Sequence, residues 1–131
     1  MSKKRRSDMR KYKRLRAEDG AFVDLRIKPV KVGKIVDISR GGLAFRYLRV
    51  GGRLGETFEL DMFSRNNDFR MEKVPVRTIW DRGSPGQLSF STRRRLRGVQ
   101  FGKLTQEQLS ELECFIFLNT VTEGEQKGAV H

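Results

Sequence analysis

Residues 32–48 read VGKIVDISRGGLAFRYL, and this stretch decides the fold. It holds two apolar runs, Val32–Ile38 and Leu43–Leu48, separated by a short polar segment that ends in Gly41-Gly42. Short runs rich in Val, Ile, Leu and Phe on either side of a Gly-containing turn are typical of two paired strands. Because side chains alternate along a strand and Ile38 continues the apolar run, Asp37 and Ser39 are expected on the opposite face. The stretch therefore predicts a hairpin with a polar Asp/Ser face beside its turn.

The same strand-like pattern recurs on both sides of this hairpin. Further runs occur at 21–27, 57–63, 71–80, 87–91 and 96–101, separated by Gly, Asn, Asp and Pro turn signals. The period then changes, since Thr105-Gln-Glu-Gln108 has the pattern of a capping box and Leu109, Leu112 and Ile116 share one helical face. The sequence predicts an all-β body, a small barrel or a sandwich, closed by one C-terminal helix of about 12–15 residues.

Positive charge is concentrated in two places. The chain of 131 residues fits one domain and carries a net charge of +12. Residues 1–16 hold nine Lys/Arg and one acid, and Arg93, Arg94, Arg95 and Arg97 form a second patch. We expect a flexible basic arm over 1–16, a barrel with its helix over 17–121, and a disordered tail over 122–131. Two patches on a neutral body predict an anionic partner without naming it.

Several classes of protein are disfavoured by composition. Cys114 is the only cysteine, so an internal disulfide is excluded, and no apolar run approaches the roughly 20 residues of a membrane span. The basic N-terminus is not followed by an apolar segment, so it does not resemble a signal peptide, and we expect a cytoplasmic location. An enzyme is disfavoured because the only histidine is His131 and Cys114 falls in a predicted apolar helix, where a buried structural thiol is expected. Neither metal-ligand spacing nor a cofactor motif stands out.

Two motifs carry recognition chemistry. In Arg10-Lys-Tyr-Lys-Arg14 the arginines lie four residues apart, and each guanidinium is a planar fork that pairs with phosphate or with a guanine edge. Tyr12, between them, is placed to anchor the arm on the body or to stack. In residues 37–42 an Asp carboxylate, a Ser hydroxyl and a Gly that permits close backbone approach provide a fixed polar floor. The alternative for this turn is purely structural, with Asp and Ser satisfying turn amides.

The two motifs in this order resemble the PilZ domain family, which is marked by an RxxxR stretch and a later [DN]xSxxG turn. PVRTIW at 75–80 and RGVQFGKLTQEQLSELECFI at 97–116 are similar to the family's closing strand and C-terminal helix. The resemblance covers roughly residues 5–118 and implies a six-stranded antiparallel split barrel with one C-terminal helix. It also implies a receptor for the bacterial second messenger cyclic di-GMP, without a cofactor. Because folding the charged arm over the nucleotide would change the surface offered to other proteins, we expect the arm to order on binding and to relay the signal to an unnamed partner protein. The implied ligand-binding residues are Arg10, Arg14, Asp37, Ser39, Arg40, Gly41, Gly42 and Trp80.

Alternatives remain open at this point. Trp80 is either a platform for guanine or an ordinary strand aromatic, and for the arginines at 93–97 a solvated loop is favoured over an extension of the cationic rim. The second candidate function is a small basic barrel that binds single-stranded nucleic acid through exposed aromatics. Phe45, Tyr47, Phe63 and Phe69 are the aromatics available for it, although they fit core positions equally well. A protein-interaction module that has lost its ligand is disfavoured because both motifs are intact.

Overall fold

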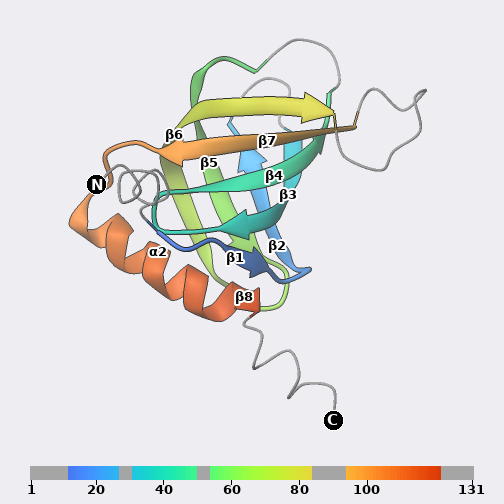
Figure 1. The fold of residues 1–131 in the computed structure, drawn as a ribbon. Coiled ribbons are helices and arrows are strands. Elements are labelled where there is room, and N and C mark those ends of the chain that lie inside the picture. Colours follow the sequence, from blue (N-terminus) through green and yellow to red (C-terminus); the bar gives the residue numbers. More distant parts are fainter. Residues whose placement is uncertain (1–11, 27–30, 50–53, 84–93, 122–131) are drawn as a thin grey trace, which may run out of the picture.

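The computed structural model describes residues 12–26, 31–49, 54–83 and 94–121, which contain eight strands and one helix (Figure 1). The elements are β1 (Leu15–Ala17), β2 (Ala21–Leu25), β3 (Lys31–Ile38), β4 (Gly42–Leu48), β5 (Thr57–Ser64), β6 (Arg70–Gly83), β7 (Arg94–Phe101), α2 (Gln106–Asn119) and β8 (Thr120–Val121). The expected arm boundary after residue 16 falls inside β1. The strand expected at 87–91, most of the basic arm and the tail at 122–131 lie outside the described residues.

Six strands close into the antiparallel barrel that the family resemblance implied. The hydrogen-bonded order is β2-β5-β6-β7-β4-β3, and pairing of β2 with β3 completes the ring. The two short strands β1 and β8 were not expected from the sequence. They extend the sheet beyond β3, with β1 paired to β3 and β8 paired to β1.

One edge of β3 pairs with two different strands. Its first half pairs with β2, from Leu25↔Lys31 to Phe22↔Lys34, whereas Asp37 and Ile38 pair with β1. Between them Val36 is the extra residue of a β-bulge, because the register on β4 passes from Ile35↔Phe45 to Asp37↔Ala44. A bulge re-aims the side chains that follow it. As a result Ile35 and Ile38 both enter the core, while Asp37 stays half-buried on the outer face, as predicted.

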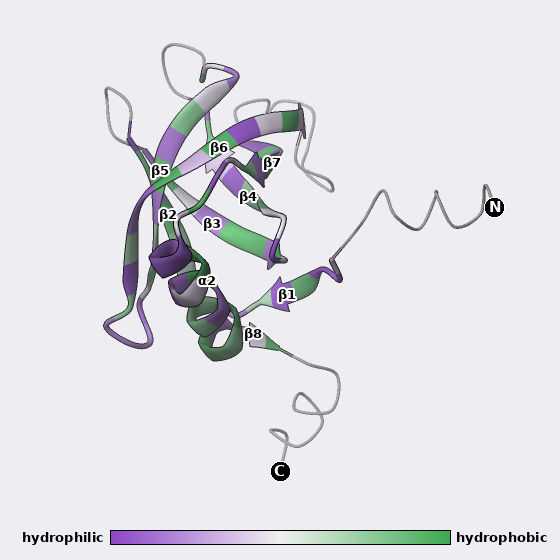
Figure 2. Ribbon diagram, turned by 90° about the vertical axis from the view of Figure 1, so that its left-hand side faces the viewer, coloured by the Kyte–Doolittle hydropathy of each residue, from purple (hydrophilic) through white to green (hydrophobic). Residues whose placement is uncertain are grey.

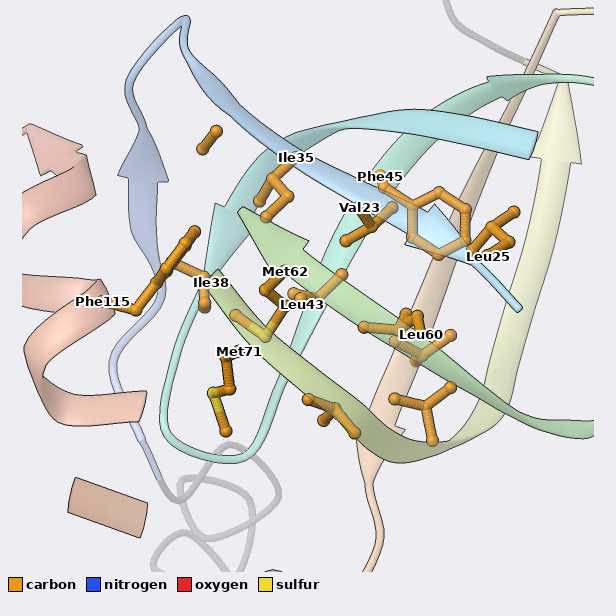
Figure 3. Close-up of a cluster of buried hydrophobic side chains, with 14 of the residues drawn as sticks. Val23, Leu25, Ile35, Ile38, Leu43, Phe45, Leu60, Met62, Met71 and Phe115 are labelled. Carbon is orange, nitrogen blue, oxygen red and sulfur yellow. The ribbon is translucent and has the colours of Figure 1, made fainter. Parts of the chain in front are cut away.

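Apolar side chains from all six barrel strands fill the interior (Figure 3). On β2 the buried residues alternate strictly, which matches a strand with one face in the core. Hydrophobic and hydrophilic residues alternate along other strands too (Figure 2). The largest side chains with less than 2% exposure are Phe45, Phe115, Leu25, Ile35, Ile38, Leu43, Leu60, Met62, Met71 and Leu112.

Helix α2 packs against one end of the barrel, and its start is set by the predicted capping box (Figure 1). The Gln108 N–H donates to Thr105 Oγ1 at 3.0 Å, and the Thr105 N–H donates to Gln108 Oε1 at 3.1 Å. The predicted buried face is partly wrong. Leu112 is buried and Ile116 packs on the core, but Leu109 is 41% exposed and Phe115 takes the central position, edge-on to Phe69 with ring centroids 5.5 Å apart.

Two phenylalanines on α2 allow a matched test of this packing. Phe115 is fully buried and Phe117 is 82% exposed. We expect Phe115→Ala to lower the free energy of unfolding by about 3–5 kcal/mol, because it removes contacts and leaves a cavity. Phe117→Ala should change it by no more than about 0.5 kcal/mol. Urea denaturation of both variants measures this, and equal effects would contradict the placement of the helix.

Candidate functional site

The β3–β4 turn carries the polar motif, and its hydroxyl group is engaged locally. Ser39 is 7% exposed, and its N–H donates to the Gly42 carbonyl at 2.8 Å. The Gly41 N–H donates to Ser39 Oγ at 3.1 Å. Such a side-chain contact two residues ahead fixes a turn in the way a backbone hydrogen bond does. Ser39 therefore shapes the turn, which is the structural role that the sequence left open.

Gly42 is required by packing within the barrel. A Cβ at this position would lie 2.1 Å from the Val99 carbonyl oxygen, because β4 and β7 approach closely here. Its backbone is not in the left-handed region, so conformational freedom is not the reason for glycine. The neighbouring Gly41 carbonyl accepts a hydrogen bond from the Phe101 N–H at 2.9 Å. These contacts hold the turn rigidly against β7.

Strand β1 joins the RxxxR stretch to this turn. Its register on β3 is Leu15↔Ile38 and Arg16↔Asp37, so the chain just before β1 runs alongside Ser39. The Arg14 guanidinium forms an ion pair with the Asp37 carboxylate, and their side chains are 26% and 31% exposed. Diagonal side chains on neighbouring strands are within reach of a long residue such as arginine. One arginine of the first motif and the acid of the second thus meet, while Arg10 lies outside the described residues.

Two further residues tie the turn to its surroundings. The Tyr12 ring lies against Gly41, where a Cβ would be 3.2 Å from Tyr12 Cδ2, so Tyr12 anchors the end of the arm on the turn. Arg40 points the other way and forms an ion pair with Glu113 of α2, with Arg40 Nη2 3.1 Å from Glu113 Oε2. Both side chains are more than half exposed, and such surface pairs contribute at most about 1 kcal/mol. Arg40 is therefore held weakly.

Trp80 lies on the same outer face as Asp37, three strands away. The cross-strand register runs Asp37↔Ala44, Ala44↔Gly98 and Gly98↔Trp80 through β3, β4, β7 and β6. Neighbouring strands are about 4.8 Å apart, so the row spans roughly 14 Å. The Trp80 ring rests over Gly98, where a Cβ would lie 2.4 Å from its Cε2 atom. The Arg82 guanidinium lies over the ring, with its carbon 4.6 Å from the ring centroid.

Ala44 and Gly98 lie between Asp37 and Trp80 in this row, and neither was expected from the sequence to belong to the site. Their neighbours Leu43 and Val99 point into the core, so alternation places Ala44 and Gly98 on the outer face. Ala44 is only 2% exposed, and the Trp80 ring covers Gly98, so this row is closely packed. The signal in the sequence that could have identified these two positions is the alternation of small residues with core residues on adjacent strands.

Two other expectations need correction. Arg94, Arg95 and Arg97 belong to β7 rather than to a solvated loop, and Arg97 is only 8% exposed, because its side chain is paired with Asp81. Arg93 lies outside the described residues. Cys114 was expected to be a buried thiol, but it is exposed on α2.

Within the described ranges, no helix has the length and apolar character needed to cross a membrane. The same part of the chain contains no group of three or more His, Cys, Asp or Glu side chains that could hold a metal ion.

Comparison with known proteins agrees with this architecture. The PilZ domain family matches residues 8–118. Among solved structures, the PilZ domain with c-di-GMP of YcgR from Escherichia coli superposes with a TM-score of 0.66 at 14% identity, over 82% of this chain and 88% of that one. The Borreliella burgdorferi PlzA protein in complex with c-di-GMP gives a TM-score of 0.55 at 13% identity, over 93% of this chain and 60% of that one. No curated protein matched the sequence.

At these identities the two structures show likeness of fold alone, whereas the family match covers most of the chain. It includes Arg10 and Arg14 and the whole of the 37–42 turn. The chain belongs to the PilZ domain family.

Proposed function

We propose that this protein is a receptor that binds cyclic di-GMP on the outer face of the barrel, between the end of the arm and Trp80. The observation that carries the proposal is the ion pair of Arg14 with Asp37, because it joins the two recognition motifs into one surface. The complexes of YcgR and PlzA with c-di-GMP support the ligand class. Membership in the family supports a receptor rather than an enzyme.

In this proposal Asp37 has two tasks. Its carboxylate orients the Arg14 guanidinium, and it accepts hydrogen bonds from the N1–H and N2–H₂ edge of a guanine. Arg10 and Arg14 hold phosphate and guanine through paired N–H donors. Ser39, Gly41 and Gly42 keep the turn rigid and close to the ligand, and Arg40 exchanges its weak pairing with Glu113 for contact with the nucleotide.

Trp80 is proposed as the platform for one guanine. The cross-strand row supports this role, since Gly98 lets the indole lie against the sheet on the same face as Asp37. Stacking of a base on the indole requires Arg82 to move from the ring face or to share it. A base stacked on an aromatic side chain is worth about 1–3 kcal/mol.

We further propose that the arm orders over the ligand and so changes the surface offered to a partner protein. The concentration of positive charge in residues 1–16 supports this, because clustered cations attract a ligand that carries two phosphate groups. Ordering each arm residue costs about 1–2 kcal/mol, which the new contacts must offset. Net affinity in the micromolar to nanomolar range, about 8–12 kcal/mol, is expected. The identity of the partner is left to experiment.

Binding of single-stranded nucleic acid is the weaker candidate. That function needs aromatic side chains exposed on a strand surface. Phe45 and Tyr47 are buried, Phe63 stacks on Phe22 with ring centroids 5.8 Å apart, and Phe69 packs against Phe115. A steep fall of affinity with salt, tolerant of Asp37→Ala, would favour nucleic acid over cyclic di-GMP.

The two motifs each contribute one charged residue whose removal can be tested. Arg14→Ala and Asp37→Ala should each weaken binding of cyclic di-GMP by about 10- to 150-fold, because each removes charge-assisted hydrogen bonds worth about 1.5–3 kcal/mol. Arg65→Ala is the matched control, since Arg65 stacks on Phe22 away from the turn. Calorimetry measures affinity and stoichiometry together, and absence of heat with the wild type would refute the proposal.

The role of Trp80 as a platform for guanine can be tested by substitution. Trp80→Ala should weaken cyclic di-GMP by about 5- to 150-fold, in keeping with the loss of one stacked base, while Trp80→Phe keeps most of the affinity. Quenching of indole fluorescence provides an independent readout, because Trp80 is the only tryptophan. Unchanged affinity in Trp80→Ala would remove Trp80 from the site.

Ordering of the arm can be tested by amide exchange. Saturating cyclic di-GMP should slow amide exchange in residues 5–16, because the arm gains backbone contacts when it covers the ligand. Exchange in the core strand β5, which is already protected, serves as the internal control. Unchanged exchange in residues 5–16, with binding intact, would contradict ordering of the arm.

A further inference from the structure

A cavity lies at the end of the barrel away from α2. Its volume is about 500 Å³, and its charged lining residues are Lys31, Arg49, Arg95, Arg97, Glu56 and Asp81. These residues cluster where β3 and β7 begin and where β4 and β6 end. In Figure 1 these strand ends lie on the side of the barrel opposite α2. The cavity is therefore separate from the β3–β4 turn, which lies at the other end of β3 and β4.

The arginines of β7 enter this cavity from inside the barrel. Arg97 is in register with Phe45, and Arg95 with Tyr47, and both of these β4 residues are buried on the core side. Asp81 Oδ1 accepts from Arg95 Nε at 2.6 Å, and Asp81 Oδ2 accepts from Arg97 Nε at 2.6 Å. The Tyr47 hydroxyl donates to Oδ2 at 2.5 Å, and Arg97 Nη1 donates to Thr78 Oγ1 at 2.8 Å. One carboxylate thus holds two guanidinium groups.

The cluster of Asp81 with Arg95 and Arg97 has fewer carboxylates than guanidinium groups. A second cluster in the same molecule shows how such an excess of positive charge is balanced elsewhere. Asp61 also holds two guanidiniums, those of Arg26 and Arg70, but Arg70 pairs with Asp24 and Glu72 as well. No further carboxylate pairs with Arg95 or Arg97 among the described residues, and Lys31 and Arg49 have no ion-pair partner there. The cavity therefore presents four cations against two carboxylates.

The protonation states keep this imbalance at neutral pH. Burial on its own raises the pKa of Asp81, but the hydrogen bonds from Tyr47, Arg95 and Arg97 outweigh it and lower that pKa below its ordinary value. The hydrogen bond to Asp81 raises the pKa of Arg95. Burial, followed by the hydrogen bond to Asp81, raises the pKa of Tyr47, so its hydroxyl stays a donor. Uncompensated positive charge in a partly enclosed, weakly screened space favours a bound anion.

We propose that this cavity is a second binding site that takes a phosphate group, with Arg95, Lys31 and Arg49 as the phosphate ligands and the Asp81–Arg97 pair as its fixed floor. The Nε atom of Arg95 donates to Asp81, and its side chain also interacts with Tyr47. The terminal amino groups carry further N–H donors for phosphate oxygens. A volume of about 500 Å³ is that of a small-molecule site and holds a phosphomonoester as well as inorganic phosphate.

The test titrates the full-length chain, without cyclic di-GMP and at constant ionic strength, with inorganic phosphate, with guanosine monophosphate and with guanosine. The ¹⁵N signals of Tyr47, Asp81 and the Arg95 Nε group report binding. Both phosphate-bearing ligands should shift them saturably, and guanosine should not. Tighter binding of the monophosphate than of phosphate identifies a phosphomonoester as the natural source, and equal affinities identify free phosphate.

Lys31→Gln and Arg49→Gln should each weaken phosphate binding at least fivefold, and Arg65→Gln should leave it unchanged. Because Arg49 is exposed and makes no ion pair with a described residue, its replacement leaves the fold intact even if changes at Arg95 do not. Arg14→Ala should bind phosphate as the wild type does, so this result is independent of the cyclic di-GMP proposal. Absence of saturable shifts, or shifts insensitive to both Gln variants, would overturn the site.

Discussion

The pairing of β1 with the second half of β3 is the constraint on which the functional face depends. The same edge of β3 pairs first with β2 and then, after the bulge at Val36, with β1. The bulge turns Asp37 outward, and the register of β1 brings Arg14 to it. Without this shared edge, the RxxxR stretch would be a basic tail with no fixed relation to the turn. Two residue pairs between β1 and β3 thus connect the charged arm to the barrel.

Close packing of β4 on β7 prepares the other half of this face. Gly42 allows the two backbones to approach, and Gly98 allows the Trp80 ring to lie flat against the sheet. Ala44 lies between Gly98 and Asp37 in the same cross-strand row. The opposite face of the β6–β7 pair is different, because Asp81 and Arg97 turn inward to the barrel end. The β6–β7 pair therefore carries Trp80 over Gly98 on its outer face and the Asp81–Arg97 ion pair in the charged cavity on its inner side.

Local patterns in the sequence predicted the elements that local interactions determine. The capping box at Thr105 and the alternating strands that fall within the described residues were found where expected, since both depend on residues a few positions apart. The face of α2 was harder, because the apolar run at 114–118 offers more than one buried stripe, and Phe115 rather than Leu109 took the core position. Strands β1 and β8 have only three and two residues, and their pairing joins distant parts of the chain. From the sequence alone Arg97 is expected to be exposed to solvent. Its burial depends on the contact with Asp81, 16 residues away, which local patterns do not reveal.

The central claim is that the two motifs act as one site because Arg14 and Asp37 are paired. A double-mutant cycle on cyclic di-GMP affinity tests this most directly, using Arg14→Ala, Asp37→Ala and the double variant in calorimetry. Residues in contact and sharing a ligand show interaction free energies of about 0.5–3 kcal/mol. We predict that the double variant loses much less affinity than the sum of the single losses. Strictly additive losses would show that the two residues contact the ligand independently and would contradict the account.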